Sequence, residues 1–188
     1  MSTTETTASS PPPEHKKIFL AAVDESEESI HALSWFANKI LPASSSSHQH
    51  RSTLVLLYVK PPPPLYFSPD GHVFSADVMA AMDKYRNDVA ECVMVKAKRV
   101  CKEAAGDNDN GDYQVKVETM IENGDARDVI CQVAEKLGVD VLVMGSHGYG
   151  PIKRAFLGSV SNHCAQNVKC PILIIKRPKS NKATTSDS

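Results

Sequence analysis

Val141-Leu-Val-Met-Gly-Ser-His-Gly-Tyr-Gly150 begins as an apolar run of strand type and ends as a glycine-bearing loop, and Pro151-Ile-Lys-Arg-Ala-Phe-Leu-Gly-Ser-Val-Ser161 follows it. Gly145 and Gly148 allow the backbone to turn sharply and to approach a ligand without an intervening Cβ. Gly158 and Ser159 stand where a helix would begin, so free N–H groups and a positive dipole end would face an anion there. The stretch therefore predicts a strand, a loop and a helix that together can hold a phosphate group.

The spacing of these glycines excludes two common phosphate-binding motifs. It does not fit the G-x-G-x-x-G dinucleotide fingerprint. Gly145 and Gly150 have the separation of a P-loop, but Pro151 occupies the position of the P-loop lysine. A glycine loop after a strand can also be a plain connector, so the rest of the chain has to decide between the two interpretations.

The composition indicates one globular domain. The chain has 188 residues, of which 41% are hydrophobic and 23% charged, and these values permit a single sizeable core. A net charge of −1 argues against a large nonspecific surface for nucleic acid or for membranes. No apolar run approaches the ~20 residues that a membrane-spanning helix needs, so we expect a soluble protein.

The cysteines and the N-terminus bear on the compartment. The first residues lack the charged-then-apolar plan of a secretory signal. The five cysteines form no C-x-x-C pair, and an odd number cannot all pair within one chain. We expect a reducing compartment, the cytoplasm with the nucleus as the alternative, and no metal site. Redox sensing by one of the cysteines stays open.

Segments of strand type alternate with segments of helix type along the chain. We expect strands at 18–23, 54–59, 114–121, 139–144 and 171–175, and helices at 26–41, 75–105, 126–137 and 159–168. This alternation predicts an α/β fold with a parallel sheet and helices on both faces. Residues 1–15 are low in complexity and residues 178–188 are polar, so we expect disordered tails on either side of a domain at 16–177.

Local signals refine three of the expected helices. Ser26 is a candidate N-cap of the first helix, and Gly138 is a candidate C-cap of the third. The long helix at 75–105 should bury one apolar stripe. The stripe predicted from helical spacing consists of Val78, Met82, Tyr85, Val89, Cys92 and Val93.

The pattern Gly145-x2-Gly148-x9-Gly158-Ser159 resembles the ATP-binding motif of the universal stress protein family. The resemblance continues into Lys17–Ser26 and Cys170–Lys176, and it covers roughly residues 16 to 177. It implies an open five-stranded sheet of order 3-2-1-4-5, a Rossmann-like fold of the adenine nucleotide alpha hydrolase kind. In that order the first and fourth strands are neighbours at the point where the winding reverses, which is where such sheets bind ligands.

The resemblance also implies a role for each site residue. Ala22, Val23 and Asp24 would line the adenosine, with the Asp24 carboxylate accepting hydrogen bonds from the nucleoside. Val59 would present backbone groups and an apolar face to adenine. The residues expected around the ribose and the phosphates are Met144, Gly145, His147, Gly148, Gly158, Ser159, Val160 and Ser161. Two alternatives stay open, because Asp24 could begin a turn before Ser26 and Ser159 could be only a helix N-cap.

By this resemblance the chain is an adenine-nucleotide-binding module, for ATP or AMP with Mg²⁺ as a companion, that acts as a regulator or a chaperone-like protein in stress. The alternative is a slow ATP-hydrolysing enzyme of the same fold. The sequence has neither a Walker lysine nor a carboxylate pair for Mg²⁺ that would support ATP hydrolysis. We therefore expect no catalytic residues. The carboxylates of Asp24-Glu-Ser-Glu-Glu-Ser29 would repel a pyrophosphate.

The last strand predicts self-association. Pro171–Ile175 is apolar on both faces, and the inferred strand order places it at an edge of the sheet. An exposed edge of this kind invites pairing with another chain. Since universal stress proteins similarly dimerise through their last strand, we expect a homodimer. The sequence identifies no other protein partner.

Overall fold

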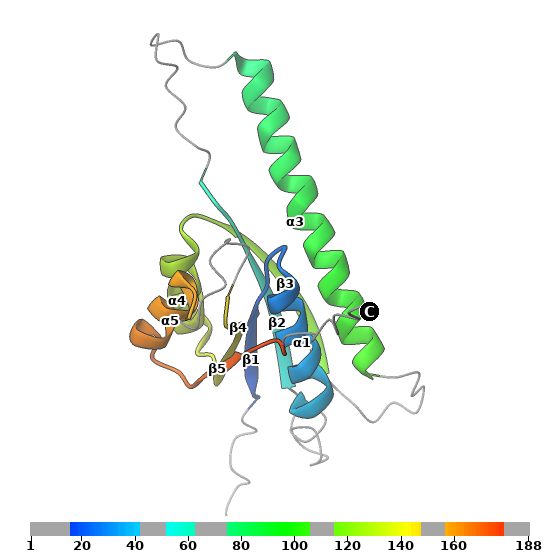
Figure 1. Cartoon of the computed structure of the whole chain (residues 1–188), viewed down its shortest axis with the longest axis vertical. Coiled ribbons are helices and arrows are strands. Elements are labelled where there is room, and N and C mark those ends of the chain that lie inside the picture. The colour runs from blue at the N-terminus through cyan, green and yellow to red at the C-terminus, as the bar shows by residue number, and fades with distance from the viewer. Residues whose placement is uncertain (1–15, 42–51, 63–74, 106–114, 148–156, 179–188) are drawn as a thin grey trace, which may run out of the picture.

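Strands and helices alternate along the chain as the sequence predicts. The structure is a computed structural model that describes residues 16–41, 52–62, 75–105, 115–147 and 157–178 (Figure 1). The elements in these ranges are β1 (Ile18–Ala22), α1 (Glu27–Lys39), β2 (Ser52–Lys60), α3 (Ala76–Ala105), β3 (Val115–Asn123), α4 (Ala126–Leu137), β4 (Val141–Gly145), α5 (Ser159–Asn167) and β5 (Ile172–Ile175). The expected tail at 1–15 lies outside the described residues, as do residues 179–188 of the tail expected at 178–188.

The strands form one parallel sheet in the order β3-β2-β1-β4-β5, which confirms the expected order. β1 is the central strand, and Ala21 pairs with Leu56 of β2 on one side and with Val143 of β4 on the other. Because the strands are parallel, their carboxyl ends meet at one edge of the sheet. β3 and β5 are the two outer strands of the sheet.

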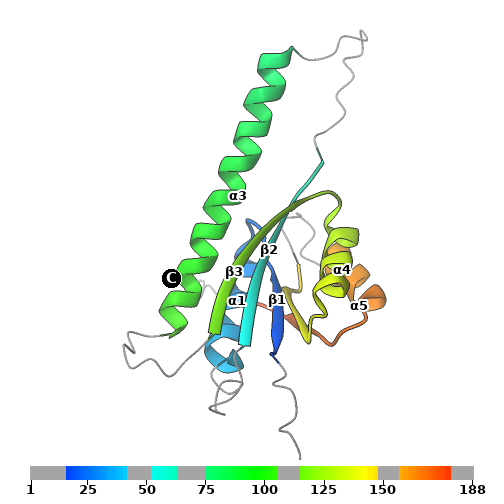
Figure 2. The same ribbon diagram turned by 180° about the vertical axis from the view of Figure 1, so that it is seen from behind.

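Helices cover both faces of the sheet (Figures 1 and 2). α1 and α3 pack on one face, against side chains such as Phe19, Leu54 and Val143. α4 and α5 pack on the other face, against Leu20, Leu142 and their neighbours. Successive residues of β1, β2, β4 and β5 alternate between these two cores, since side chains of a strand point to opposite faces in turn. β1 and β2 are therefore apolar on both faces, as the unbroken apolar runs in their sequences predict.

Side chains and glycine define the helix ends. Ser26 caps α1, with its Oγ accepting from the Ser29 nitrogen at 3.1 Å, and Asp125 caps α4 by accepting from the Arg127 nitrogen at 2.9 Å. Gly138 ends α4 at φ 61°, in the left-handed region. The caps predicted at Ser26 and Gly138 are confirmed. The N-cap of α5 is Gly158 and not Ser159, so the N-cap alternative for Ser159 is wrong.

The apolar stripe predicted for α3 is wrong over the first half of the helix. The residues that α3 buries are Ala90, Val93, Met94, Ala97 and Cys101. Val78 and Tyr85 of the predicted stripe are 40% and 69% exposed, and Cys92, farther along the helix, is exposed as well. The physical reason is visible in Figure 1, where the N-terminal turns of α3 extend beyond the sheet and away from the other described elements. Although α3 has 30 residues, no helix in the described ranges is both long and apolar enough to cross a membrane.

Candidate functional site

The carboxyl ends of β1 and β4 lie side by side at the centre of the sheet. The register of these strands pairs Ala21 with Val143, and continued by two residues it sets Val23 opposite Gly145. The Val23 nitrogen still donates to the Leu57 carbonyl at 2.9 Å, and the Ser146 nitrogen donates to the Ile175 carbonyl at 3.0 Å. The chain leaves the sheet after these bonds. The two segments singled out in the sequence, around Asp24 and Gly145, therefore meet at one edge.

The predicted site residues divide between the two faces of the sheet. Ala22, Val59 and Met144 belong to the core under α4 and α5, and Val160 of α5 packs against the same core. Ala22, Val59 and Val160 are only partly buried. Val23 is 5% exposed and points into the opposite core under α1 and α3. Its side chain cannot face the same ligand as Ala22, so only its backbone is available on that side.

Asp24 forms the turn that starts α1. Its Oδ1 accepts a hydrogen bond from the Ser26 nitrogen at 3.1 Å and another from the Ser26 hydroxyl. The Ser29 hydroxyl closes the turn from the other side, since it lies 3.1 Å from both the nitrogen and the carbonyl oxygen of Asp24. The turn interpretation that the sequence left open is thus realised. Both hydrogen bonds to the Asp24 carboxylate end on Oδ1, so Oδ2 takes no part in the turn.

Gly145 is required for packing at this edge. A Cβ built on Gly145 would lie 3.0 Å from the carbonyl carbon of Glu28 and 3.0 Å from the nitrogen of Ser29. These are backbone atoms in the first turn of α1, and they cannot swing away as a side-chain tip could. The absence of a side chain at Gly145 lets the start of α1 approach the end of β4.

The first turn of α5 is tied to the end of β4 through the carbonyl of Ser146. That oxygen accepts from the Gly158 nitrogen at 2.8 Å and from the Ser161 hydroxyl at 3.0 Å. A Cβ on Gly158 would stand 3.3 Å from the His147 Cα and 3.4 Å from the Ser146 oxygen. Residues 158–161, which begin 13 positions after the last residue of β4, are therefore fixed beside it.

The start of α5 carries no side-chain cap, in contrast to α1 and α4. The Asn162 nitrogen is the first to bond within the helix, to the Gly158 carbonyl at 2.9 Å. The nitrogens of Ser159, Val160 and Ser161 therefore precede the intrahelical ladder, and together with the helix dipole they make a surface suited to an anion. The Ser159 side chain is exposed, whereas Ser161 is 2% exposed and its hydroxyl is occupied by Ser146 and Gly158.

His147 is half-buried and lies at the same edge. Its Nδ1 is 3.1 Å from the Ser146 hydroxyl, so one of the two groups donates to the other. Gly148 lies outside the described residues. The structure thus assembles Asp24, Gly145, His147 and the first turn of α5 at one edge, and it leaves Gly148 undescribed.

Residues 16–176 match the sequence model of the universal stress protein family. The match covers most of the chain and includes every helix and strand that the structure describes. The chain belongs to the universal stress protein family. The predicted family and the predicted fold are both confirmed.

Relatives of known name support the assignment. The chain is 43% identical over 60 residues to the universal stress protein A-like protein of Arabidopsis thaliana, covering 32% of this chain and 34% of that protein. It is 28% identical over 170 residues to universal stress protein PHOS34 of the same plant, covering 84% of this chain and 60% of PHOS34. This universal stress protein therefore spans about a third of one relative and less than two-thirds of the other.

Solved structures share the fold. A universal stress protein family protein from Arabidopsis thaliana with AMP bound aligns with a TM-score of 0.55 at 21% identity, over 90% of this chain and 97% of that one. A universal stress protein in complex with cAMP aligns with a TM-score of 0.54 at 20% identity, over 85% of this chain and 96% of that one. At these identities the likeness concerns the fold alone.

Sequence reasoning missed one contact at the edge of this universal stress protein. The Tyr58 hydroxyl at the end of β2 donates to Glu25 Oε1 at 2.5 Å and so joins β2 to the turn after β1. Burial raises the pKa of Tyr58 far above its usual value, and the bond to Glu25 and the charge of that carboxylate raise it further. The sequence signal for this contact was a tyrosine within an otherwise aliphatic strand, because a buried tyrosine hydroxyl usually forms a hydrogen bond.

The charges at this edge are unevenly distributed. The turn after β1 and the first turn of α1 carry Asp24, Glu25, Glu27 and Glu28, of which Glu27 pairs with Arg177. The first turn of α5 carries no acidic side chain. Within the described ranges, no three or more His, Cys, Asp and Glu side chains are grouped so that they could hold a metal ion.

Proposed function

We propose that this universal stress protein binds an adenine nucleotide, ATP or AMP, at the sheet edge between β1 and β4. The observation that carries the proposal is the uncapped first turn of α5, which is fastened to the end of β4 through the Ser146 carbonyl and lies beside a glycine. An anion is the natural partner of such a helix start. The family membership and the AMP and cAMP complexes of proteins with this fold support the same ligand class.

The nucleoside would lie toward β1 and β2. Ala22, Val59 and Met144 supply apolar surface from one face of the sheet, and adenine is a flat, largely apolar ring. The Asp24 carboxylate would accept hydrogen bonds from ribose hydroxyls through the oxygen that the turn does not use. Val23 would contribute backbone atoms only.

The phosphates would lie at α5. Their negative charge disfavours the acidic first turn of α1 and favours the N–H groups of Ser159, Val160 and Ser161. Gly145, His147, Gly148 and Gly158 would border the ribose and the first phosphates. A Mg²⁺ ion, if it accompanies ATP, would be held by the phosphates and water, since such sites commonly take few protein ligands.

We further propose that nucleotide binding serves a regulatory or chaperone-like role in a homodimer formed through β5. Ile172, Leu173 and Ile174 are only partly buried, although they are aliphatic and belong to an outer strand. Pairing of β5 with its copy would satisfy the backbone N–H and C=O groups along its outer edge and would cover more of these aliphatic side chains.

Calorimetric titration with ATP, AMP and GTP tests the nucleotide site. Gly158→Val places a branched side chain against Ser146 and His147, and we expect it to abolish adenine-nucleotide binding. Ser159→Ala should lose about fivefold in affinity, or ~1 kcal/mol, if its exposed hydroxyl also donates to phosphate.

Gly138→Asn is the matched control. It changes a glycine at the far end of α4 with no atom within 4 Å of the new Cβ, and asparagine tolerates the left-handed conformation there. Circular dichroism establishes that each variant is folded. Wild-type protein that binds no adenine nucleotide would exclude the function. Full affinity in folded Gly158→Val would exclude the site.

A further inference from the structure

A side-chain hydrogen bond joins the turn after β1 to the neighbouring strand β2. The Tyr58 hydroxyl, near the end of β2, donates to Glu25 Oε1 at 2.5 Å. Within the described ranges the structure gives the Glu25 carboxylate no other hydrogen bond or ion pair. Glu25 directly follows Asp24, whose carboxylate is the proposed acceptor for the ribose hydroxyls. The bond from Tyr58 therefore acts on the residue next to the proposed nucleoside contact.

Tyr58 is a fixed anchor for this bond. Its side chain is 4% exposed and packs in the core under α1 and α3, so the hydroxyl cannot move without the ring. The strand end that follows is held by α3. The Lys60 ammonium donates to Asn87 Oδ1 at 2.9 Å. The Arg86 guanidinium donates to the Pro61 carbonyl at 2.5 Å. Burial also raises the pKa of Tyr58, so its hydroxyl remains a donor at neutral pH.

The other side-chain bonds of the turn are local. Asp24 Oδ1 accepts from Ser26, and the Ser29 hydroxyl lies 3.1 Å from the nitrogen and from the carbonyl oxygen of Asp24. These bonds fix the shape of the turn, because both partners belong to it. The bond from Tyr58 comes from a strand and fixes the turn relative to β2. Glu25 is an exposed residue, and an exposed glutamate without such a partner keeps its rotamer freedom.

We propose that Tyr58 and Glu25 are positioning residues for the nucleoside, and that their hydrogen bond holds the Asp24 carboxylate where it accepts from the ribose hydroxyls. This inference rests on the proposed nucleotide site and deepens it, since it names what determines recognition of the ribose. The two residues act through Asp24. The end of β2 thus serves the site from both faces of the sheet, because Val59 offers its side chain to adenine on one face and Tyr58 positions the turn on the other.

The charge of Glu25 alone predicts the opposite effect on binding. A carboxylate near a nucleotide repels its phosphates, so removing Glu25 would strengthen binding if the charge were its only contribution. Glutamine separates the two contributions, since its amide oxygen can accept from the Tyr58 hydroxyl while the charge is gone. Positioning therefore predicts that Glu25→Ala binds ATP more weakly than Glu25→Gln does.

Titration calorimetry with ATP and with dideoxy-ATP, which lacks both ribose hydroxyls, tests the inference. We expect the wild type to prefer ATP by about tenfold, the effect of a hydrogen bond to a charged group. Tyr58→Phe and Glu25→Ala should each weaken ATP binding about fivefold and leave dideoxy-ATP binding unchanged, whereas Glu25→Gln should retain the preference. Asp24→Ala combined with Tyr58→Phe should bind ATP no more weakly than Asp24→Ala alone, because the residues act as one unit.

Tyr85→Phe is the matched control, since it removes the hydroxyl of a tyrosine that is 69% exposed on α3. It should leave the affinity for both nucleotides unchanged. Circular dichroism and urea unfolding establish the fold and the stability of each variant. Should Tyr58→Phe fail to fold, Glu25→Ala, at an exposed position, decides the question.

The possible results separate this inference from the nucleotide site itself. A hydroxyl with a purely structural role would weaken both nucleotides alike in Tyr58→Phe, and that result would overturn the positioning role. Undiminished preference for ATP in folded Tyr58→Phe and Glu25→Ala would overturn it as well, as would a wild type that binds both nucleotides equally. In these cases adenine-nucleotide binding stands. A wild type that binds neither nucleotide excludes the proposed function and, with it, this inference.

Discussion

Gly145 and Ser29 approach so closely that a Cβ on Gly145 would stand 3.0 Å from the Ser29 nitrogen. The same nitrogen donates to the Ser26 hydroxyl at 3.1 Å and so belongs to the cap of α1. The end of β4 and the start of α1 therefore pack backbone against backbone. The turn that holds Asp24 and the strand that ends at Gly145 position each other.

Gly145→Ala should destabilise the protein by about 1–3 kcal/mol, the usual cost of overpacking a rigid site. Gly138→Ala should cost about 1–2 kcal/mol for a different reason, because alanine is disfavoured at φ 61° although the space around it is empty. Urea unfolding measures both. Asparagine separates the two mechanisms, since it should recover much of the loss at Gly138 and none at Gly145. Equal recovery at both positions would contradict the steric account of Gly145.

Asp125 should stabilise α4 chiefly as a hydrogen-bonding cap. Asp125→Ala removes the bond to the Arg127 nitrogen and should cost about 1 kcal/mol, while Asp125→Asn keeps a capping oxygen and should cost less. Unfolding in urea at neutral pH compares the two variants with the wild type. If Asp125→Ala and Asp125→Asn lost the same stability, loss of the helix cap would not be the cause.

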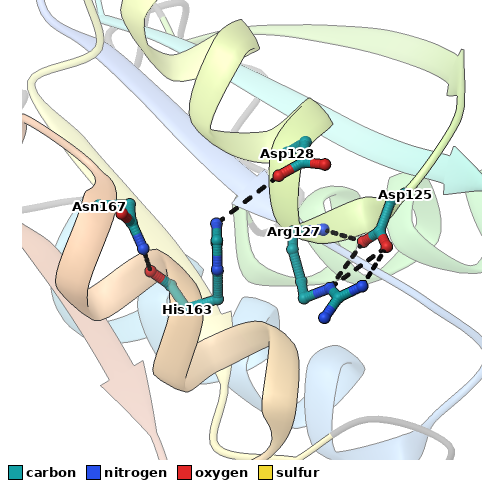
Figure 3. Close-up of polar contacts among 5 residues, drawn as sticks. All are labelled: Asp125, Arg127, Asp128, His163 and Asn167. Atoms are coloured by element: carbon teal, nitrogen blue, oxygen red, sulfur yellow. Dashed lines mark hydrogen bonds and ion pairs between the residues drawn. The ribbon is translucent and has the colours of Figure 1, made fainter.

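The same carboxylate makes the stability of α4 depend on pH. The hydrogen bonds and charge of Arg127 lower the pKa of Asp125 from 3.8 to about 2 (Figure 3). Because the folded pKa lies below the unfolded one, the stabilisation is present above about pH 4 and disappears as the pH falls toward 2. The effect is small, since the group is exposed. The difference between wild type and Asp125→Asn should shrink over this interval, and a constant difference would contradict the assignment.

Ser159 and Ser161 should have opposite phenotypes. Ser161→Ala removes a buried hydroxyl that bonds the Ser146 and Gly158 carbonyls, so it should cost about 1 kcal/mol of stability and little nucleotide affinity. Ser159→Ala should leave the stability unchanged and weaken ATP binding. Urea unfolding and calorimetry on both variants make the comparison. Loss of binding in Ser161→Ala at unchanged stability would reverse the two roles.

Ile174→Lys should convert the proposed homodimer to a monomer, because it places a charge on the outer strand β5. Val117→Lys is the matched control on β3, the opposite edge of the sheet, where the valine is 39% exposed. Light scattering should report a dimer for the wild type and for Val117→Lys. A monomeric wild type, or dissociation by Val117→Lys alone, would exclude the β5 interface.

The order of the elements and several helix caps could be predicted because they depend on local patterns. Continuous apolar runs predict the buried strands, and Ser26 and Gly138 carry cap chemistry that hardly depends on the rest of the fold. The meeting of Asp24 with Gly145 could also be anticipated. Once the strand order is given, parallel strands must bring their carboxyl ends to one edge.

Other features depend on the three-dimensional arrangement of segments far apart in the sequence, which no local pattern reveals. Helical spacing predicts an apolar stripe on α3 but cannot tell how far the sheet beneath it extends, and so Val78 and Tyr85 are exposed. The bond from Tyr58 to Glu25 joins residues 33 positions apart. The hydrogen bond of the buried Ser161 hydroxyl likewise depends on where the Ser146 carbonyl points. The nucleotide-binding roles of the site residues stay predictions.

The first turns of α3 are less buried against the domain than the turns that follow them. Arg86, whose guanidinium donates to the Pro61 carbonyl at 2.5 Å, is an early tether to the domain, and continuous burial begins at Ala90. The preceding turns are held by their own backbone bonds, and short isolated helices are marginal in water. Their amide protons should exchange with solvent through local fraying. The amide protons after Ala90 should exchange only when the whole domain unfolds. One continuous helix would thus report both the local and the global stability of the protein.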